Sequence, residues 1–437
     1  MDMTAWRHTA TLSRTFLATA IGACLVAGCG VLPGDSEGSG QTLTVMTFAP
    51  EGTKATNMPG MTGMAKAYER WVNAKGGLSG RKLRVLTCNE NNTPSGAADC
   101  ARKAVDEKAV AVVGSYSQHG RAFMAPLEAE GIPFIGGYGV SSEEFQSVLS
   151  YPVNGGQPVL LAGAGHQLGR ACDEVALVRP DTLAGDSMPI LLNAGLKANK
   201  MAEASDIRAA EDSADLSTQA REALAGTTTS AAADSKDKAR QKAKSCVTAV
   251  LGERTETFFD AFRRADSQNK KPQISSVLGS VSQSLVDRTG GKESPFEGAF
   301  LTSWYPVAAD PLWDPMRKVI ADHAFGDDGV DPDDSGTQTT WIAYTVLNEV
   351  VKRFKPDENI TARKVTRSLN QAEGVTTGGL TPDLSWRYQD MRAVAGFPRI
   401  VNGRVTFQVV QAGRLVAQEG EQTMDMTATL EQGPRAA

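Results

Sequence analysis

Two loops could bind the polar end of a small molecule, because each follows a predicted strand. The loop 115–119 (SYSQH) follows the apolar run AVAVVG, and the loop 136–141 (GGYGVS) follows IPFI. Open parallel sheets bind ligands beyond the carboxyl ends of their strands, where helix N-termini present free N–H groups. We therefore expect an anionic group to be held there, although each serine could instead cap a helix. The candidates are Ser115, Tyr116, Ser117, Gln118 and His119, followed by Gly137, Tyr138, Gly139, Val140 and Ser141.

Motifs typical of enzymes occur without the context that they require. GDSEG at 34–38 matches G-x-S-x-G, but no strand precedes it and no helix follows. DPDDSG at 331–336 begins like a calcium loop, yet its twelfth position is Ile342 instead of glutamate, so we expect an acidic loop that caps a helix. AGAGHQLG at 162–169 falls within a predicted helix, which argues against a dinucleotide site. We expect no enzyme activity, no metal and no cofactor.

The composition indicates a globular protein with room for two domains. The chain has 437 residues, of which 41% are hydrophobic and 22% are charged. The formal net charge is −5 and basic residues are not clustered, which argues against nucleic acid as a partner.

Hydrophobic periodicity predicts strands that alternate with helices. LTVMTFAP, RKLRVLTC and AVAVVG read as strands, and the segments between them read as amphipathic helices, which is the pattern of a parallel sheet covered by helices. The stretch 151–158 (YPVNGGQP) interrupts the pattern, which then restarts. We expect two doubly wound lobes, a solvated helix at 227–245, a long helix at 337–354 and two final strands at 399–410 and 413–418.

The N-terminus is typical of an export signal. Arg7 and Arg14 precede an apolar stretch from about residue 16 to 27, shorter than the roughly 20 residues of a spanning helix. The ending VAGC resembles the bacterial lipobox, which implies cleavage after residue 28 and a lipid on Cys29 that anchors the protein to the cell membrane. The alternative is an ordinary signal with an incidental cysteine. Residues 29–41 are rich in glycine and serine and would form a flexible tether.

Four further cysteines could form two disulfides in an oxidising compartment. Cys88 ends a predicted strand and Cys100 enters the next helix, whereas Cys172 and Cys246 open two strands that could lie side by side. We predict the pairs 88–100 and 172–246 among the three possible connectivities. Free buried thiols are the alternative. A zinc site is disfavoured because the spacings are wide and histidines are few.

The stretch 71–117 resembles the opening lobe of type I solute-binding proteins of ABC importers, in the leucine/isoleucine/valine-binding branch. The matching features are Asn73, Gly76, Gly77, Gly80, Arg81 and Gly114. IPFIGGYG, FEGAFLTSWYP and IAYTVLNEV fit later family features, so the similarity covers nearly all of 42–433. The resemblance implies an α/β fold of two doubly wound parallel-sheet lobes joined by a multi-strand hinge. Lobe 1 would comprise 42–155 plus 305–390, and lobe 2 would comprise 156–304 plus 391–433.

In that family, the two loops hold the carboxylate and ammonium groups of an amino acid. The family's second-lobe tyrosines would fall at Ala184 and near Glu253 and Arg254, and its acid near Ser280 or Val281. No carboxylate stands at that last place, so either Glu253 or Asp181 replaces it or the ligand lacks an amino group. Asn57 and Trp304 are candidate wall residues, and Trp304 could equally be packing.

The resemblance implies an extracytoplasmic, lipid-anchored protein that captures a small polar solute, either an amino acid or an amino-acid-like molecule. The lobes would close by hinge bending, and permease subunits of an ABC importer would receive the solute. The alternative is a ligand-sensing subunit of a signalling receptor with the same fold. We expect a monomer.

Overall fold

The computed structural model describes residues 40–226, 244–266, 272–326, 329–392, 394 and 396–432. The predicted signal 1–28, Cys29, nearly all of the tether and nearly all of the helix expected at 227–245 lie outside the described residues. Within the described part, no helix is both long enough and apolar enough to cross a membrane.

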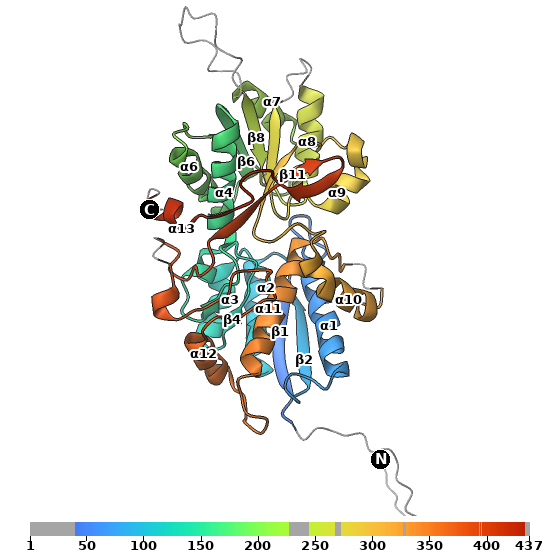
Figure 1. The fold of residues 1–437 in the computed structure, drawn as a ribbon, viewed down its shortest axis with the longest axis vertical. Helices are drawn as coiled ribbons and strands as arrows, with labels where there is room; N and C mark the ends of the chain where they lie inside the picture. The colour runs from blue at the N-terminus through green and yellow to red at the C-terminus, as the bar shows by residue number, and fades with distance from the viewer. Residues whose placement is uncertain are drawn as a thin grey trace, which may run out of the picture. The chain divides into compact units, whose positions relative to one another are not determined.

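The first lobe is built on a parallel five-stranded sheet with the order β2-β1-β3-β4-β5 (Figure 1). Residues of β1 face two layers of helices: Val45 belongs to the core that includes α1 and α11, and Phe48 belongs to the core that includes α2 and α3. The strands are β1 (Leu43–Ala49), β2 (Leu83–Asn89), β3 (Ala111–Val113), β4 (Phe134–Ile135) and β5 (Ser150–Tyr151). The helices are α1 (Pro59–Ala74), α2 (Pro94–Asp106), α3 (Gly120–Glu130), α10 (Asp314–His323), α11 (Ser335–Val351) and α12 (Ala362–Gln371), with short turns η1 (Ser142–Phe145), η4 (Pro311–Trp313) and η5 (Tyr388–Asp390).

The second lobe repeats this plan on a larger, mixed sheet with the order β12-β11-β10-β9-β8-β6-β7, with β13 also on β11. Leu177 faces the layer of α4 and α6, whereas Val178 faces α7 and α8. Its strands are β6 (Glu174–Pro180), β7 (Ser205–Ala209), β8 (Ser245–Ala249), β9 (Gln273–Val277), β10 (Phe300–Ser303), β11 (Arg404–Gln411), β12 (Arg414–Ala417) and β13 (Thr423–Asp425). Its helices are α4 (Gly156–Ala171), α5 (Leu183–Asp186), α6 (Met188–Ala198), α7 (Ser217–Gly226), α8 (Arg254–Ala265), α9 (Gln283–Arg288) and α13 (Thr427–Gln432), with the turn η3 (Gly291–Glu293).

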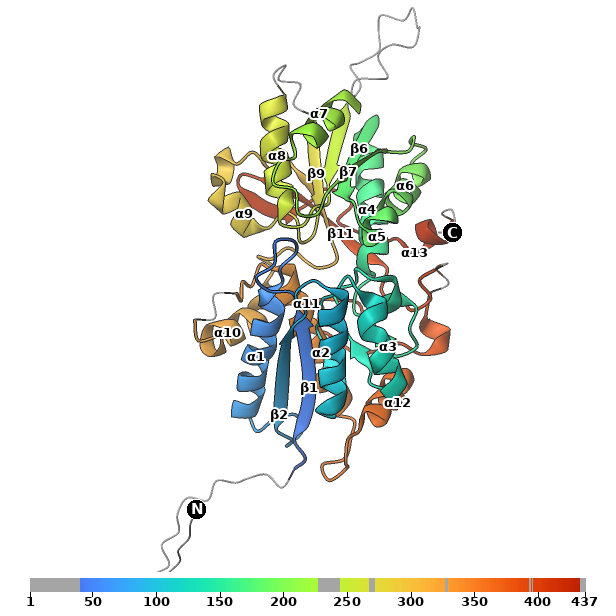
Figure 2. The same cartoon turned by 180° about the vertical axis from the view of Figure 1, so that it is seen from behind.

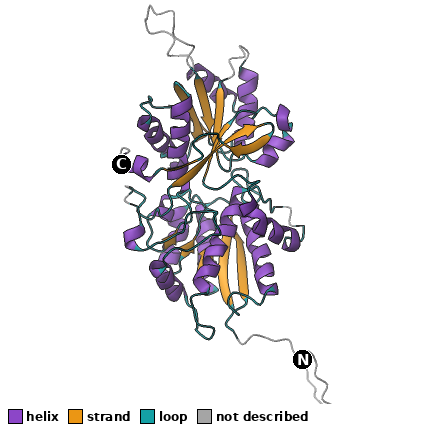
Figure 3. Cartoon of the chain, viewed as in Figure 1, coloured by secondary structure: helices purple, strands orange, loops and turns teal. Residues whose placement is uncertain are grey.

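Both sheets lie between layers of helices (Figure 3), which confirms the predicted fold class. The C-terminal strands depart from the parallel pattern, because β11 pairs antiparallel with β10, β12 and β13. The prediction that the chain ends in two strands was incomplete, since β13 and α13 follow them.

The chain passes between the lobes three times: after β5, after β10 and before β11 (Figures 1 and 2). Tyr305 joins two of these passages to the first lobe, because its hydroxyl lies 3.0 Å from Asn154 Nδ2 and 3.0 Å from Thr339 Oγ1. In the third passage, Asn402 Nδ2 donates to the Val153 carbonyl at 3.1 Å. These side chains form the contacts of a hinge made of several chain segments.

Two disulfides are present, between Cys88 and Cys100 and between Cys172 and Cys246, paired as predicted. The first ties the end of β2 to α2. The second links Cys246, at the start of β8, to Cys172, which lies two residues before β6, the neighbour of β8 in the sheet.

Candidate functional site

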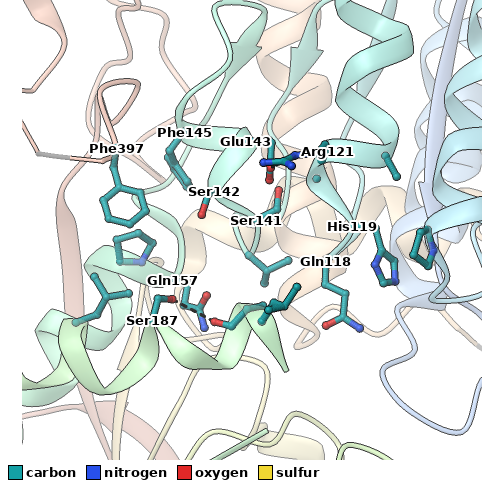
Figure 4. A pocket seen from close by; sticks show the side chains of 18 residues that line it. Gln118, His119, Arg121, Ser141, Ser142, Glu143, Phe145, Gln157, Ser187 and Phe397 are labelled. Atoms are coloured by element: carbon teal, nitrogen blue, oxygen red, sulfur yellow. Dashed lines mark hydrogen bonds and ion pairs between the residues drawn. The ribbon is translucent and has the colours of Figure 1, made fainter. Parts of the chain in front are cut away.

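A cavity of about 670 Å³ opens between the two lobes (Figure 4). The first lobe contributes residues around the start of α3 and around η1, the hinge contributes the start of α4, and the second lobe contributes α5 and α6. The polar and charged lining residues are Gln118, His119, Arg121, Ser141, Ser142, Glu143, Gln157 and Ser187, and the larger apolar ones are Val140, Phe145, Pro158, Leu183, Leu191 and Phe397. Because both lobes form its walls, the cavity could enclose a small molecule.

The serines of the loop 115–119 lie beneath the cavity and hold the loop. Ser115 Oγ accepts the N–H of Phe48 at 3.0 Å, and the Ser115 carbonyl accepts the N–H of Tyr138 at 2.9 Å. Ser117 Oγ donates to Glu90 Oε2 at 2.9 Å and accepts the N–H of His119 at 3.1 Å. The loop is therefore shaped by its own side chains before any ligand arrives.

Gln118 and His119, also in this loop, do line the cavity. Gln118 Nε2 donates to Asn92 Oδ1 at 2.9 Å and to Glu211 Oε1 at 3.2 Å. Glu211 follows β7 of the second lobe, so this contact crosses the cleft. His119 Nε2 is buried without a hydrogen-bond partner among the described residues.

Three aromatic side chains predicted for the site, Tyr116, Tyr138 and Trp304, are buried together and do not line the cavity. The ring of Tyr138 lies 5.3 Å from the ring of Tyr116 and 5.3 Å from the ring of Trp304, edge-on in the second case. The hydroxyl of Tyr138 lies 2.7 Å from Ser335 Oγ, and burial raises the pKa of Tyr138 above its usual range. Trp304 Nε1 donates to the Gly156 carbonyl at 3.0 Å. These rings pack against each other and fix the hinge side of the site.

The second predicted loop folds around an internal carboxylate. Glu144 accepts the N–H groups of Gly139, Val140 and Ser141 at 2.9, 3.0 and 3.0 Å, and it accepts the Ser141 hydroxyl at 3.1 Å. Glu144 is 2% exposed, and burial raises its pKa to about 7 despite these bonds. Val140 and Ser141 line the cavity, while Glu144 lies behind them.

A second buried carboxylate, Glu90, lies at the end of β2 and is fully buried. Its partners are the Ser117 hydroxyl and the N–H of Asn92 at 3.0 Å. Burial raises its pKa to about 7, because these two bonds favour the charged form less than desolvation disfavours it.

The second-lobe candidates are more dispersed, and none of them lines the cavity. Asp181 is exposed after β6 and faces Arg208 at 3.6 Å, whereas Glu253 is exposed just before α8. Ser280 is 8% exposed in the turn after β9, where its N–H donates to the Val277 carbonyl.

Arg254 contacts the first-lobe loop that contains Asn57. Arg254 donates to the Ser213 carbonyl in its own lobe and, at 2.9 Å, to the Lys54 carbonyl in the first lobe. Asn57 Oδ1 accepts the N–H of Thr53 at 2.7 Å, and its amide group donates to carbonyls of the same loop. Asn57 thus shapes the loop that Arg254 contacts.

Sequence reasoning did not find Glu90, Glu144 or Glu211. Two signals are present in the sequence. Glu90 and Glu211 lie one and two residues after strands, and Ser141-x-x-Glu144 is the spacing of a capping box, which the structure contains. The acidic loop at 331–336 does cap a helix, because Asp334 accepts the N–H of Thr337 at 2.7 Å. No group of three or more potential metal ligands gathers within the residues described.

The model of a family described as periplasmic binding protein matches residues 46–398. The chain belongs to the periplasmic binding protein family. Members of this family are solute-binding proteins and not enzymes, which confirms the prediction of no enzyme activity. The comparison with curated proteins finds no match.

Solved structures of periplasmic binding proteins share the fold at low identity. A possible leucine/isoleucine/valine-binding protein from Rhodopirellula baltica SH 1 is 16% identical, with a TM-score of 0.70 over 88% of this chain and 98% of that one. A fatty acid ABC transporter substrate-binding protein from Thermomonospora curvata is 17% identical, with a TM-score of 0.68 over 90% and 95%. An ABC transporter solute-binding protein from R. palustris in complex with benzoate is 17% identical, with a TM-score of 0.65 over 88% and 97%.

Proposed function

We propose that this periplasmic binding protein captures a small polar solute between lobe 42–155 plus 305–390 and lobe 156–304 plus 391–433. The observation that carries the proposal is the cavity lined by both lobes, whose lining combines amide and hydroxyl groups with apolar side chains. A solute there would lose its contact with water on both sides once the lobes close. Amino acids and amino-acid-like molecules are the first solutes to test.

Delivery to the permease subunits of an ABC importer is the proposed outcome of binding. The solute favours closure only through the contacts that it makes in the closed state and not in the open one. The hinge formed by three chain passages allows such a motion without unfolding either lobe. The second candidate function is ligand sensing, in which a signalling receptor, instead of a permease, binds the closed form.

Anchoring to the membrane by a lipid on Cys29 is part of the same proposal. A tethered binding protein would stay close to its permease and raise the local concentration of solute there. The sequence before and after Cys29 supports this, since an apolar stretch precedes it and a segment rich in glycine and serine follows.

The function is tested on the full chain extracted from membranes with detergent. A thermal-shift screen of amino acids, short amides, urea and aromatic acids should find at least one solute that raises the melting temperature. Crosslinking in cells should recover permease subunits, and the Cys29→Ser variant should move to the soluble fraction. A screen without any stabilising solute contradicts the binding proposal, whereas recovery of a kinase or chemoreceptor favours the sensor.

A further inference from the structure

The backbone donors of the second loop are already occupied by Glu144. Three consecutive N–H groups, of Gly139, Val140 and Ser141, converge on its carboxylate at 2.9 to 3.0 Å. A capping box alone would require only the N–H of Ser141, the residue before η1. The two additional bonds form a nest of backbone donors of the kind that binds anions.

The surrounding chain is shaped for this carboxylate. A Cβ atom on Gly137 would lie 2.1 Å from Glu144 Oε2, so a side chain at position 137 would collide with the carboxylate. Gly139 has a φ of 90°, a conformation that side chains other than glycine rarely adopt. Both glycines therefore serve the placement of Glu144 behind the loop.

Two of the polar groups that line the cavity near this loop, Ser141 and Gln118, are left as hydrogen-bond acceptors. The Ser141 hydroxyl donates to Glu144, so it can offer only lone pairs to a solute. Both N–H bonds of the Gln118 amide have acceptors, Asn92 and Glu211, which leaves Gln118 Oε1 to accept. Arg121 is the cation on the rim, where it lies 3.9 Å from Glu143 and is almost fully exposed.

We propose that Glu144, from behind the loop, determines the class of solute by engaging the backbone N–H groups that a solute carboxylate would otherwise require. This inference rests on the proposed function and narrows it: the solute presents N–H or O–H donors to the loops 115–119 and 136–141 and carries no carboxylate there. Amides and amines fit this description. A solute carboxylate at the same place would find its donors taken and would lie near the carboxyl groups of Glu144 and Glu211.

Matched probes test the inference on the detergent-extracted full chain. The probes are amino acids with their amides, benzoate with benzamide and hexanoate with hexanamide, measured by calorimetry. For the parent protein, we expect the best amide to bind at least tenfold more tightly than its carboxylate partner. Equal or tighter binding of a carboxylate overturns the inference while supporting the proposed function. Absence of binding by every probe and by every compound of the wider screen rejects both.

Removal of the internal carboxylate should reverse the preference. Glu144→Ala empties the nest, so we expect the carboxylate probes to gain at least tenfold in affinity relative to their amides. Acetate at millimolar concentration should raise the melting temperature of Glu144→Ala and leave that of the parent unchanged, which a purely structural role would not produce. Glu130→Ala is the matched control, because Glu130 is an exposed glutamate of the same lobe that does not line the cavity; it should keep the preference of the parent.

A second variant covers the case in which Glu144→Ala does not fold. Glu144→Gln keeps the size of the side chain and removes its charge, so it should reduce the discrimination against carboxylates by at least threefold. An unchanged ratio of amide to carboxylate affinity in either folded variant, without stabilisation by acetate, contradicts the inference.

Discussion

The carboxyl group of Glu90 makes stability depend on pH. Its pKa is raised from 4.5 to about 7 in the folded protein by burial, with Ser117, Asn92 and Tyr116 as its neighbours. Between these two pH values the folded state keeps a proton that the unfolded chain has released, so the free energy of unfolding decreases as pH rises from 4.5 to 7. The loss for this group amounts to at most about 3 kcal/mol.

Glu90→Gln should remove this part of the pH dependence. We expect the variant to gain stability relative to the parent as pH rises from 4.5 to 8, measured by urea unfolding at intervals of half a pH unit. Glu144, whose pKa is also raised to about 7, contributes a slope of the same sign, so a smaller slope remains. The exposed Glu130→Gln is the control. A parent slope that Glu90→Gln leaves intact would show that Glu90 is ionised throughout.

At the scale of residues, the sequence predicted two loops that reach the cavity but not the direction of each side chain. Gln118, His119 and Val140 line the cavity, whereas Ser115 and Ser117 bond to Phe48 and Glu90 beneath it. The order of residues in a loop does not determine which of them faces the solute, because the partners that turn a side chain inward come from distant parts of the chain. Glu90 lies 27 residues before Ser117.

The two disulfides should contribute unequally to stability, because they close loops of different length. Cys172 and Cys246 are 74 residues apart, and Cys88 and Cys100 are 12 apart. The chain-entropy model gives about 4.5 kcal/mol for the long loop and about 3 kcal/mol for the short one. The double variant Cys172→Ala/Cys246→Ala should therefore unfold at a lower urea concentration than Cys88→Ala/Cys100→Ala. Both remove the same atoms, so each is the control for the other, and the reverse order would contradict the entropic explanation.

At the scale of elements, local patterns predicted most strands and helices because each has its own apolar periodicity. The predicted strand at 399–410 is an instructive exception, since β11 begins only at Arg404. Arg399 and Asn402 precede it and bond instead to the carbonyls of Ser150 and Val153 as the chain passes between the lobes. The alternation of residues in this segment looked like a strand, but the hinge, a tertiary feature, determined its structure.

For the molecule as a whole, contacts across the cleft set the balance between open and closed forms without solute. Gln118 meets Glu211 at 3.2 Å, and Arg254 meets the Lys54 carbonyl at 2.9 Å. Partly exposed polar contacts of this kind are worth about 0.2–1 kcal/mol each. Contacts of this strength allow the lobes to separate, but they increase the population of the closed form.

Removal of both contacts should open the protein that has no solute bound. We expect Glu211→Ala/Arg254→Ala to have a larger radius of gyration than the parent by small-angle X-ray scattering. Since only the closed form binds solute fully, the dissociation constant should rise by about twofold to thirtyfold, the effect of two such contacts. Glu203→Ala/Arg263→Ala is the matched control: it removes the same two charge types from the same lobe, where Glu203 pairs with Lys197 and Arg263 pairs with Asp260. An equal radius in both variants would mean that the hinge contacts around Tyr305, and not the rims of the cleft, hold the lobes together.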